Sequence, residues 1–167
     1  PFSLTIINAN EQHIPAIIHL AAVTWNDTYS SIISQEQIQY MLQLFYSKDV
    51  LLQQMHSRDH HFWILLDDKE ISAYAHCIED ACDPNMLKLS KLYVLPKFQG
   101  SGAGRLLLMH IENECYSLKR NRIVLNVNRN NPAKTFYLKR GFEIVQEVDI
   151  PLGKFWLNDY VMEKKLE

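Results

Sequence analysis

The chain has 167 residues, of which 47% are hydrophobic and 22% charged, and a formal net charge of -2 at pH 7. This length and composition predict a single globular domain over residues 1–167. The near-neutral charge and the lack of a basic stripe argue against a nucleic-acid partner. With no apolar run long enough for a bilayer and no signal-peptide pattern, we expect a cytoplasmic protein that does not bind membranes. Three cysteines without metal-ligand spacing predict no metal site.

The first third of the chain predicts one strand followed by three helices. Residues 3–8 form a short apolar run, and apolar residues at helical spacing then continue to about Thr28. Ser34 and Gln37 make a capping-box pattern at the start of a second helix, and Ser47 is expected to cap a third.

Residues 25–29 lie between the first two of these helices and mix aromatic side chains with a carboxylate. They could form one wall of a substrate site. The alternative places Trp25 in the core and Asp27 at a helix end, and the usual burial of large aromatics favours that alternative.

The middle of the chain predicts three strands. Residues 61–66 and 71–78 are joined by a turn at 67–69, and a third strand covers 86–94. Between the last two lies a loop, 79–85, that contains three carboxylates. Such a loop is usually solvated, but it would attract a cation if it bordered a cleft.

Three glycines at alternate positions follow the third of these strands: Gly100, Gly102 and Gly104. Glycine permits positive φ and close approach of the backbone to a ligand, and the helix predicted next offers unpaired amide groups in its first turn. This order favours a phosphate site. A Walker A loop is excluded because Arg105 follows Gly104, and the dinucleotide fingerprint fails on spacing and on the missing acidic residue.

The rest of the chain predicts a strand at 123–127, a helix at 132–140 that ends before Gly141, and strands at 142–150 and 159–165. Strands and helices in this order indicate an α/β layer fold.

Two motifs resemble the GCN5-related N-acetyltransferase (GNAT) superfamily. Gln99, Gly102 and Gly104 fit its Gln-x-x-Gly-x-Gly pattern at a strand-to-helix junction, and residues 130–142 are similar to its Asn-x-x-Ala-x-x-Phe-Tyr-x-x-x-Gly-Phe segment. The resemblance covers nearly the whole chain and implies the GNAT-like acyl-CoA N-acyltransferase fold, with a mixed central sheet, helices on both faces and a splay between strands 86–94 and 123–127. It also implies acetyl-CoA as donor. Residues 25–29 are similar to the corresponding stretch of polyamine-acetylating members.

The resemblance assigns expected roles along the two motifs. Tyr137 is the expected catalytic residue, donating a proton to the departing sulfur. Asn130 is expected either to anchor the coenzyme or to cap the helix at Pro132. The residues expected to bind the coenzyme are Leu92, Tyr93, Val94, Gln99, Gly100, Ser101, Gly102, Ala103, Gly104, Arg105, Asn130 and Tyr137.

The sequence does not identify the general base. Relatives often have a glutamate on the strand before the glycine loop, but Lys88 and Ser90 occupy those positions. A water chain through Ser90 or His76, or the carboxylate of Glu79, are the alternatives. We expect acetylation of a small, polyamine-like primary amine by a monomer or homodimer. Acetylation of protein N-termini or lysines, and non-catalytic acyl-CoA binding, are the other hypotheses.

Overall fold

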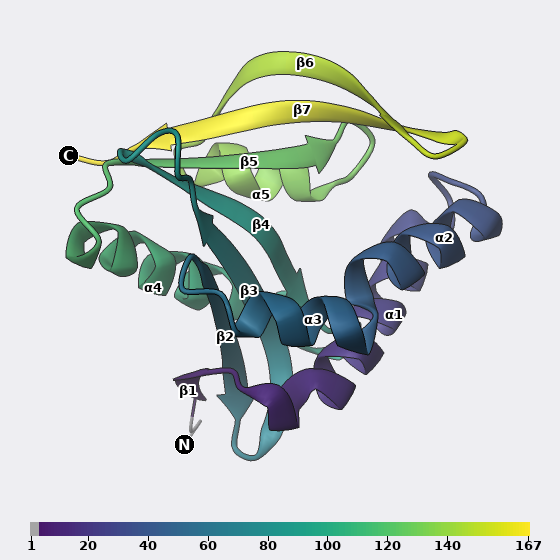
Figure 1. Cartoon of the computed structure of the whole chain (residues 1–167), viewed down its shortest axis with the longest axis horizontal. Helices are drawn as coiled ribbons and strands as arrows, with labels where there is room; N and C mark the ends of the chain where they lie inside the picture. Colours follow the sequence, from purple (N-terminus) through teal and green to yellow (C-terminus); the bar gives the residue numbers. More distant parts are fainter. Residues whose placement is uncertain (1–3) are drawn as a thin grey trace.

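The computed structural model describes residues 4–167, which form one seven-stranded mixed sheet in the order β1-β2-β3-β4-β5-β7-β6 (Figure 1). The strands are β1 (Leu4–Asn8), β2 (His60–Asp67), β3 (Glu70–Glu79), β4 (Met86–Val94), β5 (Arg122–Asn128), β6 (Glu143–Leu152) and β7 (Phe155–Lys165). The helices are α1 (Ile14–Tyr29), α2 (Gln35–Tyr46), α3 (Lys48–Met55), α4 (Ala103–Ser117) and α5 (Ala133–Lys139), with short 3-10 turns at Glu11–His13 and Pro96–Phe98. Ser3, which the sequence places in the first strand, lies outside the described residues.

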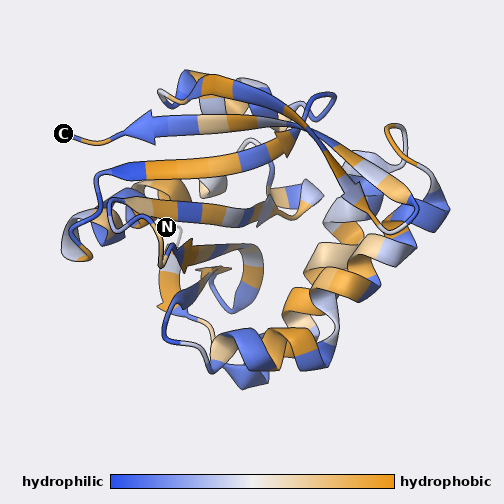
Figure 2. Cartoon of the chain, turned by 45° about the horizontal axis from the view of Figure 1, so that its top comes forward, coloured by the Kyte–Doolittle hydropathy of each residue, from blue (hydrophilic) through white to orange (hydrophobic). Residues whose placement is uncertain are grey.

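Helices cover both faces of the sheet, as predicted. Helices α1, α2 and α3 pack on one face around Ile17, Ile38 and Leu51, all fully buried. Helix α4 covers the other face through Leu107 and Ile111, and α5 packs beside it against β5. Figure 2 shows that the central part of β5 is hydrophobic, and Ile123, Leu125 and Val127 of this strand belong to the same buried cluster as the apolar face of α4. Within residues 4–167, no helix is long and apolar enough to cross a membrane.

The predicted helix caps are confirmed with one correction. Ser34 Oγ accepts a hydrogen bond from the Gln37 amide at 3.1 Å, and Ser47 Oγ accepts one from the Val50 amide at 3.3 Å. The reciprocal half of the capping box is not formed, because Gln37 Nε2 donates instead to the Trp156 carbonyl at 3.1 Å. The side chain expected to close the helix start therefore ties α2 to the β6–β7 hairpin.

The final hairpin is longer than predicted. Strand β7 begins at Phe155 rather than at residue 159, and β6 continues through Pro151, which pairs with Trp156. Proline has no amide to donate, which normally ends a strand, but β6 is an edge strand with one side unpaired. A turn at Gly153, with φ of +59°, joins the extended arms.

Strands β4 and β5 pair only at their beginnings. Parallel pairing runs from Met86–Arg122 to Lys88–Val124, whereas β3 stays paired with β4 as far as Val94. The predicted splay is therefore present, and Figure 1 shows the two strands diverging. Beyond Lys88, the edge of β4 that faces β5 has no strand partner among the described residues.

Candidate active site

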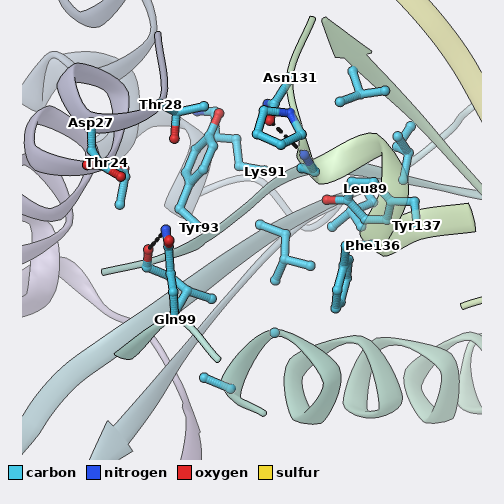
Figure 3. A pocket seen from close by; sticks show the side chains of 18 of the residues that line it. Thr24, Asp27, Thr28, Leu89, Lys91, Tyr93, Gln99, Asn131, Phe136 and Tyr137 are labelled. Atoms are coloured by element: carbon cyan, nitrogen blue, oxygen red, sulfur yellow. Dashed lines mark hydrogen bonds between the residues drawn. The ribbon is translucent and has the colours of Figure 1, made fainter. Parts of the chain in front are cut away.

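A cavity of about 1020 Å³ opens where β4 and β5 diverge. Its walls come from the end of α1, from β4 and the glycine loop, and from β5 and the start of α5. Figure 3 shows side chains from these segments around a common space. We call this cavity the cleft.

The cleft collects nearly all the predicted coenzyme-site residues. Those in its wall are Leu92, Tyr93, Val94, Gln99, Gly100, Gly102, Ala103, Gly104, Arg105, Asn130 and Tyr137. Ser101 is not part of the wall. Its side chain is exposed and its hydroxyl donates to the Phe98 carbonyl, which stabilises the loop from outside. The Ser101 amide also donates to the Phe98 carbonyl, at 3.2 Å, so Ser101 holds the turn and its neighbours Gly100 and Gly102 line the cleft.

The glycine loop is shaped by two left-handed residues. Gly100 has φ of +82° and Gly102 has φ of +89°, a region that residues with a Cβ rarely occupy. Gly102 precedes α4, so the first amides of that helix lie at the cleft without intrahelical acceptors. Gly104 has a different role, because a Cβ there would lie 3.4 Å from Phe136 Cζ. Glycine at this position lets α4 approach α5.

The open edge of β4 forms the long wall of the cleft beside Leu92, Tyr93 and Val94. The Tyr93 side chain points away into the core under α1 and α2, where its ring packs edge-on against Trp25 with centroids 6.3 Å apart. These residues therefore offer backbone groups rather than side chains to a ligand. An extended ligand that adds to a free strand edge requires this geometry.

Tyr137 lies on α5, with 7% of its surface exposed. Its ring is held edge-on between Phe136 and Phe142, with centroid distances of 5.3 and 5.5 Å. Figure 3 shows its hydroxyl directed into the cleft. Burial raises the pKa of Tyr137 above that of a free phenol, so the hydroxyl keeps its proton at neutral pH and can act as a donor.

The neighbouring residue, Asn131, decides between the two roles predicted for Asn130, which are coenzyme binding and capping of α5. Asn131 Oδ1 accepts from the Ala133 amide at 2.9 Å, so Asn131 makes the cap at the start of α5. The helix-cap alternative for Asn130 is therefore wrong. Asn130 is exposed in the wall of the cleft, and its own amide donates to Asn128 Oδ1 at 2.9 Å.

The stretch 25–29 is divided between core and cleft. Trp25 is buried in the core, whereas Asp27, Thr28 and Tyr29 line the cleft. The Tyr29 hydroxyl oxygen accepts a hydrogen bond from Asn131 Nδ2 at 3.0 Å, and burial raises the pKa of Tyr29 to about 12. The core position of Trp25 and the position of Asp27 in the last turn of α1 are thus confirmed, and Asp27 also contributes a carboxylate to the cleft wall.

Lys91 also lines the cleft, but its amine is held by α2. Nζ lies 3.5 Å from the Phe45 carbonyl oxygen and 4.2 Å from the centre of the Tyr46 ring. A cation is favoured at this position because the C-terminal end of a helix carries partial negative charge. Burial lowers the pKa of Lys91 to about 8, so part of its population is neutral near physiological pH.

Two of the three candidates for proton acceptance lie away from the cleft. Glu79 accepts from His61 Nε2 at 2.8 Å and pairs with Arg120 at 3.3 Å. His76 is fully buried beside Phe62, and its Nε2 is 2.7 Å from His60 Nδ1. Neither side chain is in the cleft wall, whereas Ser90 is.

The acidic loop 79–85 does not border the cleft. Asp83 pairs with the Arg122 guanidinium, and the Arg120 guanidinium donates to the carbonyls of Asp80 and Asp83 at 3.2 and 3.1 Å. Glu79 and Asp83 are therefore paired with arginines, and the Asp80 carboxylate accepts from the amides of Cys82 and Asp83. Since the loop is not in the cleft wall, it gives no support to a cationic substrate there.

A carboxylate that the sequence analysis did not single out lies beside the cleft. Asp159 on β7 is 8% exposed and is the one buried acidic residue within residues 4–167. It accepts a hydrogen bond from the side chain of Asn126, which lines the cleft. Burial raises the pKa of Asp159, although the Asn126 bond and the charges of Arg129 and Lys88 oppose the shift. The alternation of side chains along the strand could have placed Asp159 on the face opposite Met162. It could not have predicted that Asp159 is buried.

We expect Asp159→Asn to stabilise the protein at neutral pH. An unfolded aspartate has a pKa of about 3.9. Because folding raises this pKa, the stability that Asp159 contributes is complete below the unfolded pKa and is lost as pH rises through the folded one. Asparagine stays neutral throughout. Urea unfolding should therefore show a gain at about pH 7.5 that shrinks toward about pH 4.5, and an equal loss at both would contradict the assignment.

Residues 29–164 match the model of the acetyltransferase (GNAT) domain. The chain belongs to the GNAT acetyltransferase family. Membership makes this GNAT protein an acetyl-CoA-dependent N-acetyltransferase.

Relatives of this GNAT enzyme cover nearly its whole length. It is 29% identical to a spermidine N(1)-acetyltransferase of Thermoplasma acidophilum, over 99% of each chain. It is 27% identical to an uncharacterized N-acetyltransferase of Lactobacillus delbrueckii subsp. lactis, over 96% of each. The crystal structure of PaiA N-acetyltransferase from Thermoplasma acidophilum, in complex with coenzyme A, has a TM-score of 0.86 at 27% identity, covering 98% of this chain and 99% of its own. The predicted fold is thereby confirmed.

Proposed function

We propose that this enzyme transfers the acetyl group of acetyl-CoA to a primary amine of a small, polyamine-like molecule, by direct attack in a ternary complex. The observation that carries the proposal is that one cleft joins the glycine loop, the open edge of β4 and the Tyr137 hydroxyl to a wall containing Asp27. A donor entering along the loop and an acceptor entering past α1 would meet inside it.

The donor is held mainly by backbone groups. Amides of residues 100–104 bind the diphosphate, with Gln99 and Arg105 beside it. The pantetheine amides pair with the free edge of β4 at Leu92 and Val94, as a peptide does in strand addition. An amide on this edge also holds the thioester oxygen as charge develops on it. Spermidine N(1)-acetyltransferase and coenzyme A-bound PaiA, the relatives described above, support this assignment.

The two proton transfers involve different parts of the cleft. The departing thiolate, whose conjugate thiol has a pKa of about 8.5, takes a proton from the Tyr137 hydroxyl, which is protonated at neutral pH and regains its proton from solvent afterwards. The incoming amine, with a pKa near 10.4, is mostly ammonium at neutral pH and must lose a proton before it attacks. Since Glu79 and His76 lie outside the cleft, this proton leaves through water beside Ser90.

The acceptor end favours a molecule with more than one amine. Asp27 is an exposed carboxylate in the wall, and the buried Asp159 lies behind Asn126. While one nitrogen reacts, a second ammonium group could remain beside Asp27. The 29% identical spermidine N(1)-acetyltransferase supports a polyamine acceptor.

Asp27→Asn is therefore expected to raise KM for spermidine roughly three- to tenfold with little change in kcat, since an exposed ion pair contributes about 1 kcal/mol. A monoamine such as propylamine should be almost unaffected, because it has no second ammonium group. Steady-state thiol release measures both constants. Glu143→Gln, which removes an exposed carboxylate on β6, is the matched control. Equal effects on spermidine and propylamine would count against a polyamine acceptor.

The proposal as a whole is tested by thiol release from acetyl-CoA across a panel of amines. The panel contains spermidine, spermine, putrescine, propylamine and peptides with free N-termini or lysines. We expect turnover with the polyamines. Turnover with peptides alone would indicate a protein acetyltransferase, and coenzyme binding without turnover on any acceptor would indicate a binding module.

A further inference from the structure

The packing of the sheet does not account for the charge of Asp159. Its carboxylate is buried, yet within residues 4–167 no lysine, arginine or histidine nitrogen lies within 4.0 Å of it. The nearby Arg129 guanidinium pairs instead with Glu147 at 3.1 Å and with Asp149 at 2.7 Å. Its Nε donates at 3.3 Å to the backbone carbonyl of Asp159 rather than to the carboxylate. A buried carboxylate without a paired cation costs folding free energy, so its presence beside a cleft indicates a role in what the cleft does.

Asn126 connects this carboxylate with the cleft. In the ladder between β5 and β7, Asn126 pairs with Val161, and Asp159 lies on the same face of the sheet because it is two residues from Val161. The Asn126 side chain lines the cleft and is hydrogen-bonded to the Asp159 carboxylate. Since an ionised carboxylate can only accept, Asn126 must donate through Nδ2. Its Oδ1 is then left to accept a hydrogen bond from water in the cleft.

This contact lies where β4 and β5 begin to separate. The last paired residues of the two strands are Lys88 and Val124. Ser90 and Asn126 each come two residues later in their strands, and both line the cleft. Water that carries the proton of the incoming amine past Ser90 therefore lies beside Asn126 as well.

The titratable groups around Asp159 come from three other segments. Burial is the largest influence on Asp159 and raises its pKa, whereas Arg129 beyond β5 and Lys88 on β4 oppose that shift. Tyr29, at the end of α1, is close enough for the charge of Asp159 to contribute to its own raised pKa, and it stays neutral at physiological pH. A carboxylate with a raised pKa holds a proton more firmly than an exposed one, which makes it a better proton acceptor.

We propose that Asp159 accepts the proton that the incoming ammonium group loses, through a water molecule held by Asn126. The inference rests on the proposed function, since it requires the amine to attack the thioester inside the cleft. The ammonium group gives one proton to that water, which passes one to the carboxylate. The neutral nitrogen then bonds to the acetyl carbon as the carbon–sulfur bond breaks, and the thiolate takes the Tyr137 proton. The nitrogen releases its second proton to water, and Asp159 returns its proton to solvent as the product leaves.

The test measures kcat at saturating spermidine for the wild type and for Asp159→Asn, in the full chain, from about pH 7 to about pH 10. Near pH 7 the variant should have a kcat at least about tenfold lower, because general base catalysis contributes at least that factor. This ratio should shrink toward one as the pH approaches the pKa of the free amine, about 10.4, where the substrate needs no base. Groups that titrate in both proteins cancel in the ratio. Circular dichroism should show that the variant is folded, since the substitution removes a buried charge.

Glu163→Gln is the matched control. Glu163 lies on the same strand and the same face as Asp159, but its carboxylate pairs with Arg122 Nε at 2.9 Å and is not in the cleft wall. Its kcat should follow that of the wild type at every pH.

Three results would overturn the inference. These are an unchanged kcat of Asp159→Asn near neutral pH, a kcat ratio that stays constant across the pH range, and an effect confined to KM. The second would indicate a structural role and the third a counter-ion for the bound substrate. All three leave the proposed function intact, because the wild type still acetylates the polyamine. If the wild type acetylates no polyamine, the proposed function fails together with the inference.

Discussion

Replacing Tyr137 by phenylalanine is expected to lower kcat about tenfold or more and to leave the Kd for acetyl-CoA nearly unchanged. The reason is that the hydroxyl is directed into the cleft while the ring is packed between Phe136 and Phe142. Phenylalanine keeps that packing and removes only the donor. The thiolate must then leave without a hydrogen bond from the protein. Steady-state release of thiol measures kcat, and calorimetric titration with acetyl-CoA measures the Kd.

Tyr116→Phe provides the comparison for this experiment. Tyr116 is on α4 with 55% of its surface exposed, and it is not part of the cleft wall. Its loss of a hydroxyl should change neither constant. If Tyr137→Phe keeps the wild-type kcat, the phenol has no part in the chemistry, and the departing sulfur must be protonated by water.

Gly102→Val is expected to raise the Kd for acetyl-CoA by about tenfold or more. A β-branched residue is poorly tolerated at φ of +89°, and a left-handed conformation costs a residue with a Cβ roughly 1 to 2 kcal/mol. No atom lies within 4 Å of a Cβ built at this position, so the effect would come from backbone conformation rather than from a clash. Once the residue leaves that conformation, the amides at the start of α4 no longer point together at the diphosphate.

Gly102→Asn separates backbone conformation from side-chain size at the same position. Asparagine enters the left-handed region far more readily than valine does. It should therefore keep most of the affinity, although its side chain is as large. Circular dichroism should show that both variants retain the wild-type helix content. Equal loss of affinity in the two variants would mean that bulk at the loop, and not its conformation, disrupts binding.

The sequence predicted the elements around the cleft well because their signals are local. The serine caps at Ser34 and Ser47 depend on amides only three residues away. The glycine loop and α4 follow one another in the chain, so one short stretch contains both the turn and the helix that it begins. The late start predicted for β7 was wrong because residues 155–158 become a strand only by pairing across the turn with residues 149–152 of β6, a contact that depends on the hairpin as a whole.

Charges were predicted less well than elements. The carboxylates at 79–85 were expected to be solvated, but Arg120 pairs with Glu79 and Arg122 with Asp83, in each case from about forty residues away. Asp159 looked like an ordinary strand residue, and its burial depends on its neighbours across the sheet. Solvation and pairing depend on what lies nearby in space, which local patterns do not report.

By itself, the sequence determined an α/β succession of elements and a glycine loop that leads into a helix, because backbone conformation and helix starts depend on residues next to one another. Only the tertiary structure decided that β4 keeps a free edge after Lys88 and that the Tyr137 hydroxyl shares a cleft with Asp27. These features bring together residues far apart in the chain. Their positions follow from the packing of whole layers, which no short stretch of sequence specifies.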